Sequence, residues 1–565
     1  MEYLKNQELE VTITDMGIDG EGIGKINGYP FFVKDALPGD RVRIKVIKVK
    51  KNFAYGRLME ILVKSPDRVE APCSINRQCG GCQIQALSYE AQLRFKQNKV
   101  INNLVRIGGI DEAYLLKITE PIVGMDEPFR YRNKSQYPIG RDREGNIVAG
   151  FYAGRTHSII ACEDCRLGAK ENSVILKCII DYMNRNLISP YDEVTSDGIV
   201  RHVLIRKGFS SGEIMVCLVV NMKKGMPQKI DELVNSLTAI SGVVSIYLNY
   251  NSAKTNVILG DKCRCIYGKE VIRDTMFVKD SKSGFTENIN QGLEYEISPL
   301  SFYQINPYQV ERLYGIAVEY AGLTGSEEVW DLCCGIGTIT LSMASRAKRV
   351  HGIEIVEAAI ADANKNAVRN NVKNVDFVCA AVEDYLPAHK DEIQADVVVM
   401  DPPRKGVDER ALNVVVDARP EKIVYVSCDS ATLARDVKYL CANGYELKRV
   451  RAVDMFGQTV HVETVCLLSK LHEAKHHVSV KLDMDEMDIT SAESKATYEE
   501  IKKYVAEHND GMKASSLNIA QVKAKYGIIE RENYNKAKSE EARQPVCPKD
   551  KEEAIVEALK AFWMI

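Results

Sequence analysis

Two strand-like segments in the second half of the chain each end in a residue that can do chemistry. Ile423–Val426 is apolar, β-branched and aromatic, and Cys428 follows it, just before the helix-favouring Asp429. Val397–Met400 ends in the same way at Asp401. Open α/β sheets bind their ligands beyond the carboxyl ends of parallel strands. We therefore expect Cys428 to be a nucleophile, with its thiolate stabilised by the amino end of the next helix.

A nucleophilic cysteine gives a route to carbon methylation of a pyrimidine. A thiolate that adds to C6 turns C5 into a carbon nucleophile, and covalent catalysis is needed because C5 of uracil is otherwise unreactive. A base must then remove the C5 proton. Glu463 is the candidate, because it begins the apolar strand Thr464–Leu468, where burial raises the pKa of an acid. His461 is the competing base, and the alternative for Cys428 is an inert core thiol.

A glycine-containing turn earlier in the chain predicts a nucleoside-binding site. Gly335 and Gly337 follow the strand Val329–Leu332, and Glu354 ends the next strand. Such glycines let the backbone approach a ligand closely, and an acid at the next strand end can bind both ribose hydroxyls. Thr340 stands where the dinucleotide fingerprint has its third glycine, which favours S-adenosylmethionine over a dinucleotide. The alternative for Glu354 is an ordinary surface acid.

The motif that begins at Asp401 separates two kinds of methyl acceptor. It reads Asp401-Pro402-Pro403-Arg404. Enzymes that methylate exocyclic amino groups commonly have an aromatic residue at the fourth position, where it stacks on the base. Arg404 departs from that pattern, so the sequence favours attack by carbon over attack by an amine.

Three cysteines near the end of the first hundred residues have the types and spacing of metal ligands. Cys73, Cys79 and Cys82 need a fourth ligand, which Cys162 or Cys165 could supply. Zinc and a [4Fe-4S] cluster both accept four cysteines. The spacing matches neither the common zinc ribbon nor radical S-adenosylmethionine enzymes, so zinc is favoured only slightly. Buried cysteines without a ligand are the remaining alternative.

The segment 1–64 predicts a small β-barrel. Leu9–Ile13, Phe31–Lys34 and Arg41–Val49 have the pattern of short strands, and the glycines between residues 17 and 28 mark turns between them.

The last predicted strand of this barrel begins a basic stretch. Residues 41–57 hold seven basic residues and no acid. Period-two alternation puts three of them on one face, namely Arg41, Arg43 and Lys45. Phe53 and Tyr55 follow as candidate platforms for stacking on bases. We favour an RNA-binding barrel that contacts phosphates through its lysines over a merely solvated strand face.

A second stretch, Phe129–Tyr137, also interleaves aromatic and basic residues. This composition is as typical of a surface that stacks on unpaired RNA bases as of a strand edge with solvated cations. The sequence leaves both interpretations open.

The composition excludes several classes of protein. With 565 residues the chain is long enough for three or four domains. No apolar run approaches the ~18 residues of a membrane span, and the first residues, MEYLKNQELE, do not resemble a signal peptide. The formal net charge of -3 does not identify a nucleic-acid binder, but local charge decides that question. Sixteen cysteines without a secretion signal indicate reduced thiols, and we expect a cytoplasmic monomer.

Taken together, these motifs resemble the bacterial 23S rRNA (uracil-5-)-methyltransferases, which are relatives of the tRNA uracil-54 enzymes. The resemblance covers residues 1 to about 470. It rests on Ser301–Asn306, Asp331–Gly337, Asp401–Arg404, Val426–Asp429 and His461–Glu463. It implies that Cys428 is the nucleophile and Glu463 the proton acceptor. It also implies an S-adenosylmethionine and uracil pocket lined by Gln304, Cys333, Thr338, Glu354 and Asp401, although the family often has an aromatic residue where Cys333 stands.

The resemblance further implies an N-terminal TRAM domain and a [4Fe-4S] cluster. The cluster ligands would be Cys73, Cys79, Cys82 and Cys165, because Cys165 fits the family's Cys-x-Leu context better than Cys162. This reverses the slight preference for zinc.

The predicted fold is therefore α/β and multidomain, with four parts. Residues 1–64 form a TRAM barrel related to the OB fold, and 65–290 form an iron-sulfur α+β domain of which 88–125 can pack on the catalytic domain. Residues 291–472 form a Rossmann-like class I methyltransferase domain. Residues 473–565 comprise a polar linker, His472–Asp488, and a small helical extension of unknown role with helices over Ala496–Glu507 and Ser515–Tyr526.

The predicted reaction is S-adenosylmethionine-dependent methylation of C5 of a uridine in 23S ribosomal RNA through a covalent adduct between Cys428 and C6. The expected partner is 23S ribosomal RNA. A tRNA substrate and a non-catalytic RNA-binding iron-sulfur protein are the two alternatives.

Overall fold

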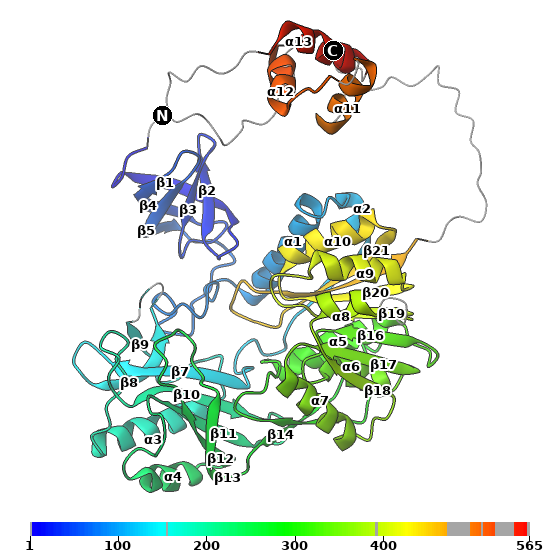
Figure 1. Cartoon of the computed structure of the whole chain (residues 1–565). Coiled ribbons are helices and arrows are strands. Elements are labelled where there is room, and N and C mark those ends of the chain that lie inside the picture. Colours follow the sequence, from blue (N-terminus) through cyan, green and yellow to red (C-terminus); the bar gives the residue numbers. More distant parts are fainter. Residues whose placement is uncertain are drawn as a thin grey trace. The chain divides into compact units, whose positions relative to one another are not determined.

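The computed structural model describes residues 3–153, 156, 158–389, 394–471, 498–509, 512–525 and 547–561. They belong to two compact units, Met1–His472 and Glu473–Ile565 (Figure 1). No helix within these described ranges is long and apolar enough to cross a membrane.

The first part of the larger unit is a closed five-stranded barrel with the strand order β1-β2-β3-β5-β4. Its strands are β1 (Glu8–Met16), β2 (Gly22–Ile26), β3 (Tyr29–Val33), β4 (Arg41–Val49) and β5 (Ala54–Val63). Alternate residues such as Phe31, Val42 and Ile44 fill its core, as a period of two requires.

Strand β2 was predicted as a turn, and that prediction is wrong. Gly22 and Gly24 lie inside the strand because the barrel wall is tight there, not because the chain reverses. A Cβ atom on Gly24 would lie 2.4 Å from the backbone oxygen of Thr12 on β1, so only glycine fits.

A seven-stranded sheet follows, in the order β13-β12-β11-β10-β7-β8-β9. Its strands are β7 (Lys134–Arg141), β8 (Ile147–Tyr152), β9 (Ile159–Ala161), β10 (Val200–Lys207), β11 (Ile214–Val220), β12 (Val243–Tyr250) and β13 (Lys262–Gly268). Helices α3 (Glu171–Arg185) and α4 (Ile230–Thr238) share an apolar core with it. A hairpin of β14 (Ile272–Met276) and β15 (Leu293–Ile297) lies between this sheet and the next in sequence.

The third part is an eight-stranded sheet in the order β18-β17-β16-β19-β20-β22-β21-β6. The strands are β6 (Thr119–Val123), β16 (Glu328–Leu332), β17 (Arg349–Glu354), β18 (Val375–Cys379), β19 (Val397–Met400), β20 (Lys422–Ser427), β21 (Tyr445–Val453) and β22 (Glu463–Lys470). The first five in this order are parallel, whereas β22 is antiparallel to β20. This is the open α/β sheet that the alternating strands and helices predict.

Helices accompany this sheet. They are α5 (Pro307–Ala321), α6 (Thr338–Ala344), α7 (Glu357–Arg369), α8 (Val382–Ala388), α9 (Glu409–Ala418) and α10 (Ser430–Ala442). Helix α5 shows how the sequence sets their ends. The Asn306 side chain caps its first turn, Pro307 occupies the first position, and Gly322 ends it with a φ of 57°.

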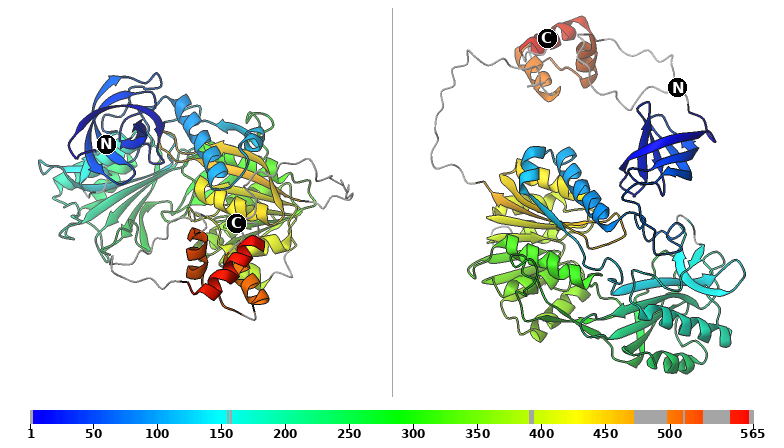
Figure 2. Two further views of the ribbon diagram at one scale, coloured as in Figure 1. Left: turned by 90° about the horizontal axis from the view of Figure 1, so that it is seen from above. Right: turned by 180° about the vertical axis from the view of Figure 1, so that it is seen from behind.

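Three elements that precede the central sheet in sequence join this third part instead. Strand β6 pairs with β21, and helices α1 (Tyr89–Arg106) and α2 (Glu112–Ile118) pack beside it. Figures 1 and 2 show α1 and α2 beside α10 and β21 from each side. The Asn103 side chain donates a 2.8 Å hydrogen bond to the Ser430 hydroxyl, which ties α1 to the start of α10.

The second unit contains α11 (Tyr498–His508), α12 (Ser516–Lys525) and α13 (Lys549–Ala561). Ile501, Val505, Ile519, Ile555 and Leu559 form its apolar core. The sequence predicted the first two helices but not α13. The predicted linker His472–Asp488 lies outside the described residues.

Candidate active site

The register of the parallel strands brings the predicted strand-end residues to one edge of the sheet. Leu332 pairs with both Ile353 and Met400, and Met400 pairs with Tyr425. The residues that follow these strand ends therefore project from the same carboxyl edge. They are Cys333, Glu354, Asp401 and Cys428.

Strand β22 completes this edge from the opposite direction. In the antiparallel pair of β20 and β22, Ser427 lies opposite Thr464. Cys428 is one step beyond Ser427 and Glu463 is one step before Thr464, so the register brings them together, and the charge of Glu463 acts on the thiol. This relation links two residues whose neighbourhood the sequence alone cannot establish.

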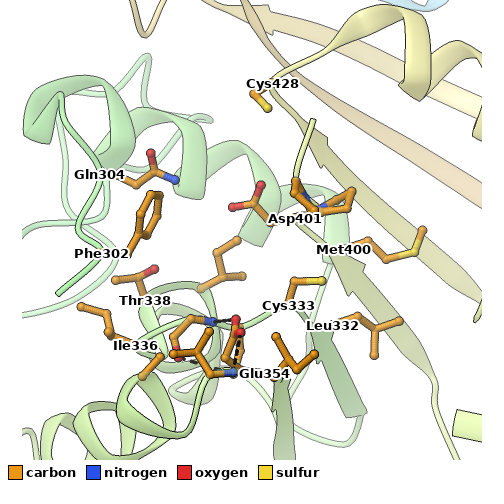
Figure 3. Close-up of a pocket in the computed structure, with 18 of the residues that line it drawn as sticks. Phe302, Gln304, Leu332, Cys333, Ile336, Thr338, Glu354, Met400, Asp401 and Cys428 are labelled. Atoms are coloured by element: carbon orange, nitrogen blue, oxygen red, sulfur yellow. Dashed lines mark hydrogen bonds between the residues drawn. The ribbon is translucent and has the colours of Figure 1, made fainter. Parts of the chain in front are cut away.

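A cavity of about 970 Å³ opens at this edge. Its lining includes all seven predicted catalytic and cofactor residues, namely Gln304, Cys333, Thr338, Glu354, Asp401, Cys428 and Glu463. Figure 3 shows Gln304, Asp401 and Cys428 around one end of the cavity and Glu354 at the other. The volume is that of a pocket for a small molecule plus part of a second ligand.

The end of the cavity near Glu354 suits a nucleoside. Glu354 accepts hydrogen bonds from the backbone N–H groups of Gly335 (3.1 Å) and Val356 (3.0 Å), which fix its carboxylate (Figure 3). Gly335 has a φ of 56°, and a Cβ atom there would meet nothing within 4 Å, so a ligand can approach its backbone. These features fit the ribose and adenine of S-adenosylmethionine.

Thr340 explains why the third glycine of a dinucleotide site is missing. Its hydroxyl donates a 2.6 Å hydrogen bond to the buried Asp331 carboxyl. Burial raises the pKa of Asp331 to about 7 in spite of this bond. The threonine thus anchors an acid under the glycine turn.

Asp401 is a partly buried acid of the cavity. Its carboxyl makes no hydrogen bond or ion pair within the described part of the chain, and it points into the cavity (Figure 3). Burial, and then the charge of Asp331, raise its pKa to about 7. An unpaired buried carboxyl is costly unless a ligand supplies a donor. The amino group of S-adenosylmethionine or N3–H of uracil would be such a donor.

The thiol of Cys428 is not stabilised as a thiolate, contrary to the prediction. Burial raises its pKa to about 11, with further contributions from Glu463 and Asp401, while Arg404 opposes the rise. The start of helix α10 does not offset this rise, and Asp429 caps that helix. Its carboxylate accepts hydrogen bonds from Ala431 (2.9 Å) and Thr432 (3.2 Å) and places a negative charge at the helix start.

Glu463 is fully enclosed, and burial raises its pKa to about 8. Asp401 adds to this rise and Arg404 opposes it. His461 also lines the cavity, but burial and nearby cations lower its pKa, so it is neutral near pH 7. His461 is therefore able to accept a proton near pH 7, whereas Glu463 must first lose its own proton. Glu463 is the one whose charge acts on Cys428.

Helix α1 holds the loop that precedes Glu463. The sequence predicted that residues 88–125 can pack on the catalytic domain, but not these contacts. The Lys96 ammonium and the Asp454 carboxylate form an ion pair of 2.5 Å with both side chains fully buried, and Lys96 also donates to the Phe456 carbonyl. Gln92 exchanges two 3.0 Å hydrogen bonds with Gln458, whose φ is 71°. These contacts fix the position of the loop.

Lys134 is a cavity residue that sequence reasoning missed. It starts β7, next to Asn133, whose side chain donates to the Gln304 carbonyl (2.8 Å). Its ammonium has no ion pair within the described residues, and burial lowers its pKa to about 8. The surrounding stretch does not stack on bases through Tyr131 and Tyr137, because both rings are buried.

The predicted cluster cysteines lie near one another. The backbone of Cys79 forms an isolated antiparallel β-bridge with Ala153, just after β8. The thiols of Cys82, Cys79 and Cys165 interact electrostatically. Burial and these neighbours raise the pKa of Cys82 to about 12. Cys165 is in hydrogen-bond contact with Cys162 and accepts from the backbone of residues 167 and 168, which lower its pKa. Among the described residues, no group of three or more His, Cys, Asp or Glu side chains is arranged to hold a metal ion.

Comparisons with known proteins agree with this geometry. A model of the tRNA (Uracil-5-)-methyltransferase family matches residues 257–471, and a model of the TRAM domain matches residues 3–59. An uncharacterized RNA methyltransferase of Halalkalibacterium halodurans is 45% identical over 465 residues, which are 82% of this chain and 97% of that relative. One of Clostridium tetani is 45% identical over 473 residues, covering 83% of this chain and 98% of its own.

The chain belongs to the tRNA (uracil-5-)-methyltransferase family and carries a TRAM domain. It is thus an S-adenosylmethionine-dependent RNA methyltransferase, as its motifs predict. The crystal structure of Pyrococcus abyssi tRNA (uracil-54, C5)-methyltransferase in complex with S-adenosyl-L-homocysteine is similar. It is 27% identical, with a TM-score of 0.64, and the match covers 81% of this chain and 100% of that one.

Proposed function

We propose that this RNA methyltransferase methylates C5 of a uridine in 23S ribosomal RNA through a covalent adduct. The observation that carries the proposal is the juxtaposition of Cys428 and Glu463 across β20 and β22, beside the unpaired carboxyl of Asp401. A nucleophile, a base and a nucleoside-binding turn then serve a single cavity. The target uridine must leave its base stack to reach it.

The Cys428 sulfur, as thiolate, adds to C6, and the electron pair of the C5–C6 double bond moves toward C5. S-Adenosylmethionine supplies the methyl group that C5 takes. The Glu463 carboxylate then removes the C5 proton, the C5–C6 double bond re-forms, and the thiolate leaves. Because Arg404 lowers the pKa of both Cys428 and Glu463, it favours the anionic forms that these steps need.

We assign the cofactor contacts to Gln304, Cys333, Thr338, Glu354 and Asp401, all of which line the cavity. Glu354 would hold the ribose hydroxyls, since its carboxylate is already oriented by two backbone N–H groups. Thr338 shares a 3.0 Å hydrogen bond with the Tyr314 hydroxyl, so this threonine would contact the cofactor through its backbone or methyl group.

Release of tritium from RNA labelled at C5 of uridine tests the reaction. Wild-type protein with S-adenosylmethionine should release it, and the Cys428→Ala protein should bind RNA without releasing it. Normal turnover by Cys428→Ala would disprove the covalent route. Absence of any methyl transfer by wild type would favour the non-catalytic alternative.

A ribosomal rather than a tRNA target is supported by the TRAM domain together with the cysteine group at residues 73–82 and 165. The similarity to a tRNA uracil-54 enzyme keeps tRNA as the second candidate. Mapping 5-methyluridine in ribosomal RNA and in tRNA from cells that lack the protein decides between them, because one mapped site should disappear.

We also propose that Cys73, Cys79, Cys82 and Cys165 hold a [4Fe-4S] cluster. All four are cysteines, the donor that such clusters use, and the other three thiols lie near enough to Cys82 to raise its pKa. Protein purified without oxygen should contain iron and sulfide, and Cys82→Ser should lose both, whereas Cys178→Ser on α3 should keep them. Iron and sulfide are measured in the same way in Cys162→Ser and Cys165→Ser, and the variant that loses them identifies the fourth ligand. Equal iron content in wild type and Cys82→Ser would contradict the assignment.

A further inference from the structure

Tyr314 lines the cavity, although it belongs to none of the motifs that the sequence singles out. It lies on helix α5, about two turns after the Asn306 cap, so the start of that helix sets its position. Its side chain is 1% exposed and belongs to the same apolar core as Leu313 and Ile339. A tyrosine buried in this way needs a partner for its hydroxyl.

The Tyr314 hydroxyl connects two cofactor residues that come from separate segments. It shares a 3.0 Å hydrogen bond with the Thr338 hydroxyl at the start of α6, and the Gln304 side chain is in hydrogen-bond contact with it. Burial raises the pKa of Tyr314 well above its ordinary value and the charge of Asp401 adds to this rise, whereas Thr338 and Gln304 oppose it. Groups that donate to the phenol oxygen have this opposing effect. The oxygen therefore accepts from both partners.

The proton of the Tyr314 hydroxyl is left for a third group. Because its pKa is raised, the phenol stays protonated near pH 7 and remains a hydrogen-bond donor. No carboxylate and no backbone carbonyl of the described residues accepts a hydrogen bond from it. A buried donor without an acceptor is costly unless a ligand supplies one. The cavity that Tyr314 lines is the place from which a ligand can do so.

The two partners of Tyr314 indicate which part of the cofactor lies beside it. In the view of Figure 3, Thr338 lies between Gln304 and Glu354, and Glu354 marks the end that suits a nucleoside. A hydroxyl between these ends faces the methionine part of S-adenosylmethionine, which joins the nucleoside to the reacting sulfur. That part offers one strong acceptor, its carboxylate, and one strong donor, its amino group. The donor Tyr314 suits the carboxylate, and the acceptor Asp401 suits the amino group.

We propose that the Tyr314 hydroxyl donates a hydrogen bond to the carboxylate of S-adenosylmethionine, while Gln304 and Thr338 hold the phenol in place. The proposal rests on the cofactor site of the proposed function and adds a cofactor-binding residue to it. The same carboxylate is present before and after methyl transfer, so the contact contributes to binding rather than to the chemical step. It makes the site selective for sulfur nucleosides that carry a carboxylate over those that lack one.

Two other acceptors compete for the same proton, namely O4 of uracil and the Asp401 carboxylate. O4 belongs to the RNA, so a hydrogen bond to it acts on the KM for RNA. Asp401 belongs to the protein, so a hydrogen bond to it acts equally on cofactor analogues with and without a carboxylate. A contact with the cofactor carboxylate is the one that distinguishes these analogues.

The test compares the binding of S-adenosylhomocysteine and of decarboxylated S-adenosylhomocysteine to the full-length protein by calorimetry. Tyr314→Phe keeps the ring and its packing and removes only the hydroxyl. It should weaken binding of S-adenosylhomocysteine about tenfold and leave the affinity for the decarboxylated analogue unchanged, because only the first ligand loses a hydrogen bond to a charged group. In the methylation assay, KM for S-adenosylmethionine should rise by a similar factor, with little change in kcat or in KM for RNA.

Tyr320→Phe is the matched control. Tyr320 is also 1% exposed on α5, but its hydroxyl donates to Glu120 at 2.9 Å and does not line the cavity, so this variant should bind both ligands like wild type. Equal losses of affinity for both ligands in Tyr314→Phe, or no loss for either, would overturn the proposal. So would a rise in KM for RNA alone, which would assign the proton to uracil. Wild-type protein that binds S-adenosylhomocysteine through Tyr314 but methylates no uridine would instead refute the proposed function and leave the carboxylate contact intact.

Discussion

Two sets of charged groups lie near the loop between Asp454 and Glu463. They differ in whether their members have a partner of opposite charge. Lys96 and Asp454 are fully buried and form an ion pair. Glu463 is also buried and Asp401 is partly buried, but their carboxyls make no hydrogen bond or ion pair among the described residues, and both line the cavity. The paired charges position the loop, whereas the unpaired acids remain able to bind a ligand or exchange a proton. Charged groups that have a partner serve the structure here, and charged groups that lack one line the site of the chemistry.

Replacing the base is expected to have the largest effect. Glu463→Gln should lower the methylation rate by about 10²–10⁴-fold, because the C5 proton is no longer removed. The covalent RNA adduct should accumulate, since elimination cannot follow, and a denaturing gel measures it. Glu354→Gln is the control, which should raise KM for S-adenosylmethionine without trapping an adduct. A Glu463→Gln protein that turns over at the normal rate would assign the base to another group, with His461 the next candidate.

Breaking the paired set should affect stability more than chemistry. Lys96→Met leaves the Asp454 carboxylate buried without its cation, which should cost about 3–5 kcal/mol in the free energy of unfolding. Urea denaturation measures this. The double variant Lys96→Met with Asp454→Leu should recover most of the loss, because neither charge remains. A single variant as stable as wild type would show that the pair does not hold the loop.

The unpaired set should make stability depend on pH. The pKa of Glu463 is about 8 in the folded chain against an ordinary value of 4.5, so between these values the folded state keeps a proton that the unfolded chain has lost. The contribution of the protonated Glu463 to the free energy of unfolding is fully present below the ordinary pKa. It is lost as the pH rises through the pKa of the folded chain. Wild type should therefore lose more stability between about pH 5 and pH 8 than Glu463→Gln. If the free energies of unfolding of the two proteins change equally with pH, the raised pKa of Glu463 is contradicted.

A smaller effect is expected at a third unpaired cavity group, Lys134. Lys134→Met removes a cation that faces the cavity without an ion pair among the described residues. We expect KM for RNA to rise severalfold with little change in kcat, because a single phosphate contact contributes modestly to affinity. A rise in KM for S-adenosylmethionine alone would place the Lys134 contact on the cofactor instead.

The sequence predicted the parts of the molecule that depend on local pattern. Apolar β-branched runs such as Ile423–Val426 identified the parallel strands, and the residues after them identified the cavity edge. The glycines of β2 were misread because tight packing against Thr12 and chain reversal both require glycine. The pairing of Arg41 with Glu10 was also missed, because a strand does not record which neighbour it will meet.

Contacts between distant segments were the other part that the sequence could not supply. The Lys96–Asp454 pair joins residues in separate halves of the chain, and no periodicity connects them. The prediction of a stabilised Cys428 thiolate was wrong for a related reason. Burial of the thiol and its closeness to Glu463 and Asp401 raise the pKa, and none of these can be read from the strand that precedes Cys428.

The most direct test of the account is covalent trapping with a ribosomal RNA fragment that carries 5-fluorouridine. Fluorine at C5 cannot be removed as a proton, so wild-type protein with S-adenosylmethionine should form an adduct that survives denaturation and maps by mass spectrometry to Cys428. Cys428→Ala should form none, although it still binds the RNA. An adduct in Cys428→Ala, or its attachment to any other residue, would contradict the account.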